Sequence, residues 1–202
     1  MCQFYFFLRH AATEDRTHLL GQSRNPSLSE EGRKQAQRWQ AVLSSIPFQV
    51  VVSSPAARAQ ETAEIIRAPS VPLLTLPEFH EINWGSWEGY ARSEAEPLLA
   101  EQRRRWTAGD SGWKPPHGES LQEIIDRITT GLAQIITSYQ TGSLLIVSHG
   151  GLLRVILCYL LGYPWAETHR FYHQEAQLSW LVRIPAGHFY VRRLAVDADT
   201  TF

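Results

Sequence analysis

The stretch FYFFLRHAATEDR, residues 4–16, joins a run of apolar residues directly to an arginine and a histidine. The segment from Phe4 to Leu8 has the composition of a short strand that is buried on both faces, because no polar residue interrupts it. Burial alone gives no reason for Arg9 and His10 to follow. We therefore expect this strand to deliver Arg9 and His10 to a functional edge of the fold.

The composition indicates a single globular domain over residues 1–202, because 44% of the residues are hydrophobic. A net charge of −1 argues against nucleic-acid or membrane-surface binding by bulk electrostatics. The two cysteines, Cys2 and Cys158, have no metal-binding spacing, and no segment resembles a leader or a membrane span. We expect a cytoplasmic protein with reduced thiols, and its association into a homodimer stays open.

Short apolar runs alternate with longer amphipathic ones along the chain. The pattern predicts strands at 4–8, 50–52, 71–76 and 144–147, and a closing hairpin at 178–184 and 189–194. Helices are expected after Ser29, after Ser54-Pro55 (with Ser54 as N-cap), over 119–139 and over 151–161. This alternation favours an α/β fold: a three-layer, doubly wound, mostly parallel sheet with helices on both faces.

Residues 85–118 lack this pattern and are interpreted as a small lid insertion. Four tryptophans gather in or just before it: Trp84, Trp87, Trp106 and Trp113. They either pack a small subdomain or form an aromatic wall beside a bound ligand.

The carboxyl ends of the predicted strands are where ligands bind in sheets of this type. Arg9 and His10 follow the first strand, Arg58 lies one turn into the helix after the second, Glu81 follows the third, and His149 follows the strand at 144–147. Each of these residues alone is more often structural than functional. Their appearance at consecutive strand ends is what points to one site.

The chemistry of this set suits phosphoryl transfer. Arginines offer forked donors that match phosphate oxygens, and a neutral imidazole can attack phosphorus. A carboxylic acid can protonate the leaving oxygen, while a second, protonated histidine would stabilise the transferring group. The two glycines after His149 open a helix whose N–H groups favour an anion. These side chains supply enough charge that no metal or cofactor is required.

Six segments in order also resemble signatures of the histidine phosphatase superfamily, which includes the cofactor-dependent phosphoglycerate mutases and the bisphosphatase domain that cleaves fructose 2,6-bisphosphate. They are LRHAAT (8–13), SLSEEGRKQA (27–36), SPAARAQETA (54–63), EINWGSWEG (81–89), HGES (117–120) and VSHGG (147–151). The resemblance implies a phosphoglycerate mutase-like fold with the lid insertion at about 85–118.

The resemblance also implies residue roles. His10 would be the nucleophile, Arg9, Arg58 and His149 the phosphate pocket, and Glu81 the proton donor and later the base. The expected activity is metal-independent hydrolysis of a small phosphorylated metabolite through a phosphohistidine intermediate, by what we class as a histidine acid-type phosphatase. Further substrate-binding residues are expected at Thr13, Arg16, Gly150 and Trp84.

Two other functions stay open. The short insertion favours a phosphatase over a mutase, but Arg103–Arg105 resemble the insertion arginines with which mutases bind a substrate carboxylate. A solvated helix face is the alternative interpretation of that run. A non-catalytic module that binds phosphorylated ligands is the third hypothesis, against which the intact Glu81 argues.

Two positions depart from the family pattern. Ala11 stands where the family has a glycine, and this substitution is costly only if the backbone there needs a positive φ. Arg16 stands where the family often has an asparagine. Its side chain would reach a second anionic group of the substrate or point to water.

Overall fold

The computed structural model describes residues 3–200 and confirms a mostly parallel sheet. The six strands are β1 (Gln3–Arg9), β2 (Phe48–Ser53), β3 (Leu73–Thr75), β4 (Gly142–Ser148), β5 (Leu178–Arg183) and β6 (Phe189–Val196). They lie in the order β3-β2-β4-β1-β5-β6. The first four are parallel, whereas β5 runs antiparallel to β1, and β6 to β5, as the predicted closing hairpin requires.

The interior position of β1 explains its uninterrupted apolar sequence. It lies between β4 and β5. Tyr5 and Phe7 belong to the core on one side of the sheet, and Phe6 and Leu8 to the core on the other side. Both faces are covered, so every residue in this run gains from being apolar.

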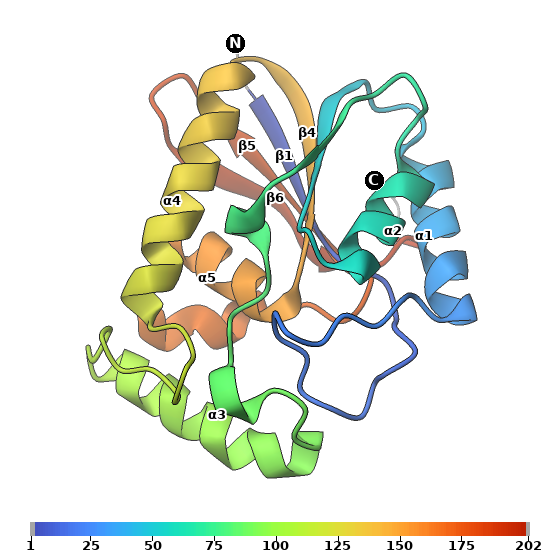
Figure 1. Cartoon of the computed structure of the whole chain (residues 1–202). Coiled ribbons are helices and arrows are strands. Elements are labelled where there is room, and N and C mark those ends of the chain that lie inside the picture. Colours follow the sequence, from blue (N-terminus) through green and yellow to red (C-terminus); the bar gives the residue numbers. More distant parts are fainter. Residues whose placement is uncertain (1–2, 201–202) are drawn as a thin grey trace.

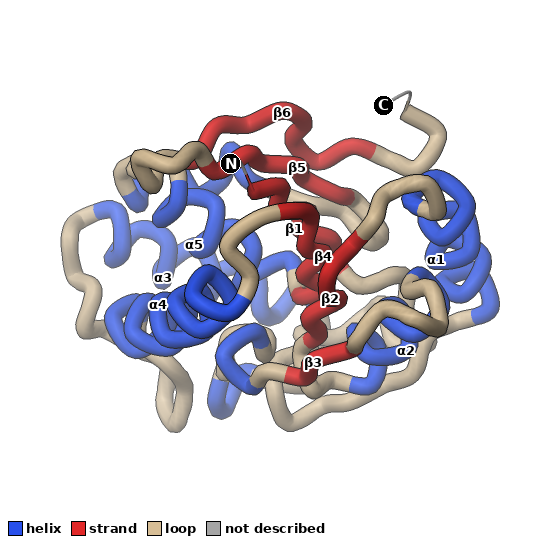
Figure 2. Tube along the Cα trace, turned by 90° about the horizontal axis from the view of Figure 1, so that it is seen from above, coloured by secondary structure: helices blue, strands red, loops and turns tan. Residues whose placement is uncertain are grey.

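Helices cover both faces of the sheet and complete three layers (Figures 1 and 2). On one face lie α1 (Glu30–Leu43) and α2 (Ala57–Ile66). On the other lie α3 (Arg92–Thr107), α4 (Leu121–Ser138) and α5 (Gly150–Leu160). Short 3₁₀ turns link these elements: η1 (Pro77–Phe79), η2 (Gly85–Trp87) and η3 (Trp165–Phe171).

Two of the predicted helix starts carry side-chain caps. Ser29 accepts a hydrogen bond from the backbone N–H of Gly32, and Ser120 forms a reciprocal capping box with Glu123 at the start of α4. The prediction that Ser54 caps α2 is wrong, because the helix begins at Ala57 and Ala56 makes no side-chain cap. The Ser54 hydroxyl lies instead 2.7 Å from His149 Nε2, inside the protein.

The lid segment (residues 85–118) contains the one helix that the periodicity did not predict, α3. This helix is mostly polar, and only three of its residues, Ala95, Gln102 and Trp106, are buried.

Cys158 is a buried free thiol, while Cys2 lies outside the described residues. Within residues 3–200, no helix is both long enough and apolar enough to cross a membrane.

Candidate active site

The register of the sheet brings three strand ends together. β2, β4 and β1 are neighbours, and Arg9 pairs with Ser148 across β1 and β4. The backbone N–H of His10 donates to Ser148 O at 2.8 Å, and that of Ser54 donates to Val147 O at 3.0 Å. Neighbouring strands lie about 4.8 Å apart, so residues at the same level become contacts. The rings of His10 and His149 accordingly lie with their centroids 5.1 Å apart.

The His10 ring is held in one tautomer. Its Nδ1 lies 2.8 Å from the carbonyl oxygen of Ala11, which can only accept a hydrogen bond, so Nδ1 carries the proton. The lone pair therefore lies on Nε2. Burial, followed by the charges of Arg58 and Arg9, lowers the pKa of His10 well below its usual value. His10 is thus a neutral imidazole with its nucleophilic nitrogen fixed, at the wall of a cavity.

His149 lies fully buried behind this wall. Its Nε2 is 2.7 Å from Ser54 Oγ, its Nδ1 has no hydrogen-bond partner, and the ring of His80 stacks against it at 5.9 Å. Burial and then the charge of Arg58 lower the pKa of His149 well below its usual value. This direction favours the neutral form of His149, so its protonation stays a prediction that depends on the bound anion. A phosphate dianion beside it would favour the protonated form.

Arg9 and Gly150 fit together at the start of α5. The Arg9 guanidinium donates from a terminal nitrogen to His173 O at 2.8 Å, while its buried Nε has no acceptor. A Cβ placed on Gly150 would lie 3.2 Å from three guanidinium atoms, which is too close for an unstrained contact. The glycine at this position therefore leaves room for the guanidinium.

Arg58 is fully buried in the first turn of α2. Its terminal nitrogens donate to the carbonyls of Arg24 and Gly21 at 3.0 and 3.1 Å, and its Nε has no acceptor. Within residues 3–200, neither Arg9 nor Arg58 forms an ion pair with a carboxylate. Two positive charges, the fully buried Arg58 and the partly buried Arg9, therefore line the cavity without a direct ion pair, which favours an anionic ligand.

The Glu81 carboxylate is fixed by backbone N–H groups. Its Oε1 accepts from Ile82 and Leu152 at 2.9 Å each, and its Oε2 accepts from Gly151 at 3.2 Å. A Cβ on Gly151 would lie 2.7 Å from Oε1, so this glycine makes room for the carboxylate. The two glycines that follow His149 thus each admit one functional side chain, Arg9 at Gly150 and Glu81 at Gly151.

The segment that leads to Glu81 is clamped from behind by Arg127 of α4. Arg127 donates to the backbone carbonyls of three residues of this segment: Glu78, His80 and Glu81. It also pairs with Glu119 of the HGES segment at 2.8 Å, and Glu119 in turn accepts from Asn83 N at 2.8 Å. This clamp positions Glu81 without touching the cavity.

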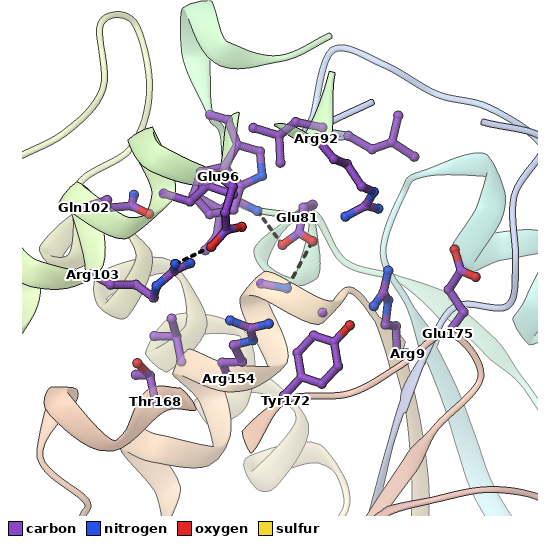
Figure 3. Close-up of a pocket in the computed structure, with 18 of the residues that line it drawn as sticks. Arg9, Glu81, Arg92, Glu96, Gln102, Arg103, Arg154, Thr168, Tyr172 and Glu175 are labelled. Carbon is purple, nitrogen blue, oxygen red and sulfur yellow. Dashed lines mark hydrogen bonds and ion pairs between the residues drawn. The ribbon is translucent and has the colours of Figure 1, made fainter. Parts of the chain in front are cut away.

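The cavity in front of these residues has a volume of about 250 Å³. Four of the five predicted catalytic residues line it, namely Arg9, His10, Arg58 and Glu81; the fifth, His149, lies just behind. Figure 3 shows Arg9 and Glu175 on one side and Gln102 and Arg103 on the other, with Arg154 and Tyr172 between them. The opening therefore extends from the sheet edge to the lid.

The predicted substrate-binding residues divide into two groups. Gly150 and Trp84 line the cavity, but Thr13 does not: it is buried, and its hydroxyl donates to Asp15 O at 2.7 Å, within its own loop. Arg16 lies in a neighbouring hollow, 2.9 Å from Glu175, with 63% of its side chain exposed. A direct substrate contact by Thr13 is therefore wrong, and Arg16 forms an ion pair at the rim.

The structure also shows where Arg103–Arg105 lie and whether Ala11 strains the backbone. Arg104 and Arg105 pair with Glu101, while Arg103 pairs with Glu96 at 2.6 Å and is the one member of the run that lines the cavity. Ala11 is fully buried, and the non-glycine residues with positive φ within 3–200 are His117, Ala176 and Ala195. Ala11 thus causes no backbone strain, and it fills space in the core against α1 and α2.

Several cavity residues were not anticipated from the sequence: Arg92, Glu96, Leu99, Gln102, Arg154, Thr168, Tyr172 and Glu175. They lie on α3, α5 and the stretch around η3, away from the strand ends. Of the four tryptophans, Trp84 and Trp106 line the cavity, whereas Trp87 and Trp113 pack on each other at 5.8 Å. No sequence signal separated these two pairs. Within residues 3–200, no group of His, Cys, Asp and Glu has the arrangement of a metal site.

A three-layer α/β fold that brings one histidine, two arginines and a glutamate to a cavity beyond the strand ends is the class of protein that binds an anionic ligand at the carboxyl edge of its sheet. The sequence model of the histidine phosphatase superfamily (branch 1) matches residues 5–197, and the chain belongs to this superfamily. The match is to branch 1, so the narrower description as a histidine acid-type phosphatase is not confirmed.

Known proteins are similar to this chain in sequence and in fold. The chain is 32% identical to a bifunctional protein of Mycobacterium tuberculosis over 85% of its own length, but spans only 48% of that protein. It is 26% identical to the adenosylcobalamin/alpha-ribazole phosphatase of Escherichia coli, covering 90% of this chain and 85% of the relative. A probable phosphoglycerate mutase of Escherichia fergusonii is 32% identical over 98% of both chains. The alpha-ribazole phosphatase of Shigella flexneri has a structure with a TM-score of 0.80, 25% identity and 96% coverage of both chains.

Proposed function

We propose that this chain is a metal-independent phosphomonoester hydrolase that acts on a small phosphorylated metabolite through a phosphohistidine on His10. This proposal rests on one observation, the combination of a histidine with two arginines at the carboxyl edge of the sheet. A neutral imidazole with Nε2 free lies beside the buried Arg58 and the partly buried Arg9, neither of which forms an ion pair with a carboxylate within residues 3–200. Such a site attracts a phosphate dianion and holds a nucleophile in its attacking form.

In the first step, Nε2 of His10 attacks phosphorus, and the bond from phosphorus to the ester oxygen breaks. Glu81 in its protonated form donates a proton to that oxygen, so the product leaves as an alcohol. Arg9 and Arg58 stabilise the charge on the equatorial phosphoryl oxygens. His149, whose Nδ1 lacks a partner, becomes a charged donor when the dianion is bound.

In the second step, a water molecule attacks the phosphohistidine. The Glu81 carboxylate accepts a proton from this water, the phosphorus–nitrogen bond breaks, and inorganic phosphate is released. His10 returns to the neutral tautomer with Nδ1 bonded to Ala11 O. Glu81 is protonated again and ready for the next ester.

A mutase-type transfer is the second candidate, because a relative named as a probable phosphoglycerate mutase matches 98% of both chains at 32% identity. A mutase would return the phosphoryl group to an acceptor hydroxyl and release little inorganic phosphate. The two functions share the first step, so they differ in the fate of the phosphohistidine.

The test measures phosphate release from p-nitrophenyl phosphate and a panel of small phosphate monoesters, with EDTA and with added Mg²⁺. We expect turnover that EDTA does not reduce, and an acid-labile phosphoryl label on His10 in rapid-quench samples. His10→Ala should lower turnover about 10⁴-fold or more. His188→Ala, an exposed histidine in the β5–β6 turn, is the matched control.

Three outcomes would contradict the proposal. Binding of phosphate esters without label or phosphate release supports the non-catalytic module. Isomerised phosphate ester with little free phosphate supports the mutase. Full turnover by His10→Ala removes the phosphohistidine mechanism.

A further inference from the structure

The lid side of the cavity holds a second set of polar groups that have no partner. Within residues 3–200, six of the buried side-chain nitrogens without a hydrogen-bond acceptor lie in or directly behind the cavity wall: Arg9 Nε, Arg58 Nε, His149 Nδ1, Gln102 Nε2, Trp106 Nε1 and Arg154 Nε. The first three belong to the part of the cavity around Arg9, His10 and Arg58, which we call the phosphate end. The other three lie on α3 and α5 and have no role in the proposed transfer.

Arg154 is the strongest feature of this second set. It makes no hydrogen bond and no ion pair to any residue in the described chain, and its guanidinium carbon lies 4.6 Å from the centroid of the Tyr172 ring. Its Nε is buried, and its guanidinium lines the cavity (Figure 3). A half-buried cation without a counter-ion is costly unless a ligand supplies the charge.

The carboxylates of the cavity wall do not supply that charge, because each already has partners. Glu81 accepts three backbone hydrogen bonds, Glu96 pairs with Arg103 at 2.6 Å, and Glu175 pairs with Arg16 at 2.9 Å. Arg103 is neutralised by the same pairing. Arg92, at the exposed start of α3, has no carboxylate partner within residues 3–200 but donates to Arg16 O at 3.0 Å. Arg154 is therefore the lid-side arginine of the cavity that makes neither a hydrogen bond nor an ion pair within the described residues.

Gln102 and Trp106 add neutral groups to the α3 side of this subsite. Gln102 is 2% exposed and makes no side-chain hydrogen bond, and its amide can offer either a donor or an acceptor. Trp106 contributes an indole N–H with no acceptor. Buried donors that lack acceptors destabilise the protein, and a bound oxygen ligand removes that cost.

We infer that Arg154, with Gln102 and Trp106, forms a second anion subsite, so that the preferred substrate carries an anionic oxygen group in addition to the phosphate that is transferred. This inference rests on the proposed function and names the class of its substrate. The group is a carboxylate or a second phosphate on the leaving alcohol. It binds on the lid side while the first phosphate lies against Arg9, Arg58 and His10.

The test uses a homologous series of ω-carboxyalkyl phosphates, matched to ω-hydroxyalkyl phosphates of equal chain length and to the corresponding bisphosphates. At the optimal chain length, we expect kcat/KM for one anionic series to exceed that of the hydroxyalkyl ester about 10- to 100-fold, which is the range for a hydrogen bond to a charged group. The carboxylate and bisphosphate arms distinguish the two anions. The optimal length measures the separation between the subsites.

Arg154→Met keeps the length of the side chain and removes its charge. The preference for the anionic series should fall to within about threefold of unity in this variant, mainly through KM. Arg104→Met is the matched control, because Arg104 pairs with the exposed Glu101 and lies outside the cavity. It should keep the full preference.

The outcomes separate this inference from the proposed function. If the wild-type protein hydrolyses none of the esters, the proposed function fails. If it hydrolyses all series equally, only the second subsite fails, and this result needs no variant. If Arg154→Met loses activity equally on every series while its melting temperature is unchanged, Arg154 binds the transferred phosphate and the inference is wrong.

Discussion

The two ends of the cavity differ in how their side chains are held. At the phosphate end, His10, Arg9 and Glu81 are fixed by hydrogen bonds to backbone groups at the ends of strands and at the start of α5. At the lid end, Arg154, Gln102 and Trp106 make no side-chain hydrogen bonds within the described chain. At the first end, backbone contacts already position the side chains, although Arg9 Nε, Arg58 Nε and His149 Nδ1 still lack partners. At the second end, no side-chain hydrogen bond positions these three residues.

This contrast fits a division of tasks. Transfer of a phosphoryl group needs charges and a nucleophile that are already in place, because reorganisation during the reaction would raise the barrier. Recognition of a leaving group needs affinity only, and unpaired donors provide it when an acceptor binds. Under the proposed function, residues at the strand ends and at the starts of α2 and α5 would carry the chemistry, and Gln102, Trp106 and Arg154 of α3 and α5 would carry the specificity.

Among the tests of this contrast, Glu81→Gln should have the largest effect, which is a loss of kcat. Loss of the proton donor should lower kcat for alkyl phosphates about 10²- to 10⁴-fold, because an alkoxide is a poor leaving group. An aryl phosphate with an acidic phenol needs no such proton, so its first step should survive and give a burst of phenol. Rapid-quench kinetics measure this burst, and melting curves control for folding. Equal losses for both substrate classes would exclude Glu81 as the proton donor.

Lowering the pH should have an intermediate effect, which is a loss of folding stability. His10, His149 and His173 are buried, and burial lowers the pKa of His173 from 6.5 to about 4. A histidine with a lowered pKa binds its proton more readily when unfolded, so its contribution to stability is complete above pH 6.5 and is lost as pH falls toward 4. At about 1.4 kcal/mol per pKa unit, His173 alone would cost the fold about 3 kcal/mol.

Denaturant titrations at several pH values between 7 and 4 measure this loss. His173→Gln should be less stable at neutral pH, because His173 Nε2 contacts Ser179 Oγ at 2.7 Å. Its stability should nevertheless change less steeply with pH. A slope identical to that of the wild-type protein would show that His173 does not titrate on unfolding.

The smallest effect is expected from the clamp behind Glu81. Arg127→Met removes donors to three backbone carbonyls and should lower kcat for alkyl phosphates about 10-fold by displacing the carboxylate. Aryl phosphates should lose less, since their leaving group needs no proton. The control is Lys114→Met, which breaks the exposed ion pair between Lys114 and Glu123, a residue of α4 like Arg127. An equal loss for both substrate classes would assign Arg127 a structural role only.

The sequence signals for the phosphate end are local. A continuous apolar run indicated β1, His10 and His149 were candidates because they directly follow strands, and Glu81 because it follows the third predicted strand; the structure places η1 between β3 and Glu81. The same local reasoning failed for Ser54, which lies two residues before the Ala56 N-cap; its hydroxyl accepts from Ala56 N at 3.2 Å and contacts His149 Nε2 at 2.7 Å. It also failed for Thr13, whose hydroxyl bonds within its own loop.

The sequence by itself determined the strand and helix pattern apart from α3, the polar residues at the strand ends and the family to which the chain belongs. Tertiary structure alone decided that β4 lies between β2 and β1, and that Arg103 is neutralised while Arg154 is left without a partner. The physical reason is range: strand and helix patterns depend on neighbours along the chain, whereas charge pairing depends on segments that meet only when the chain has folded.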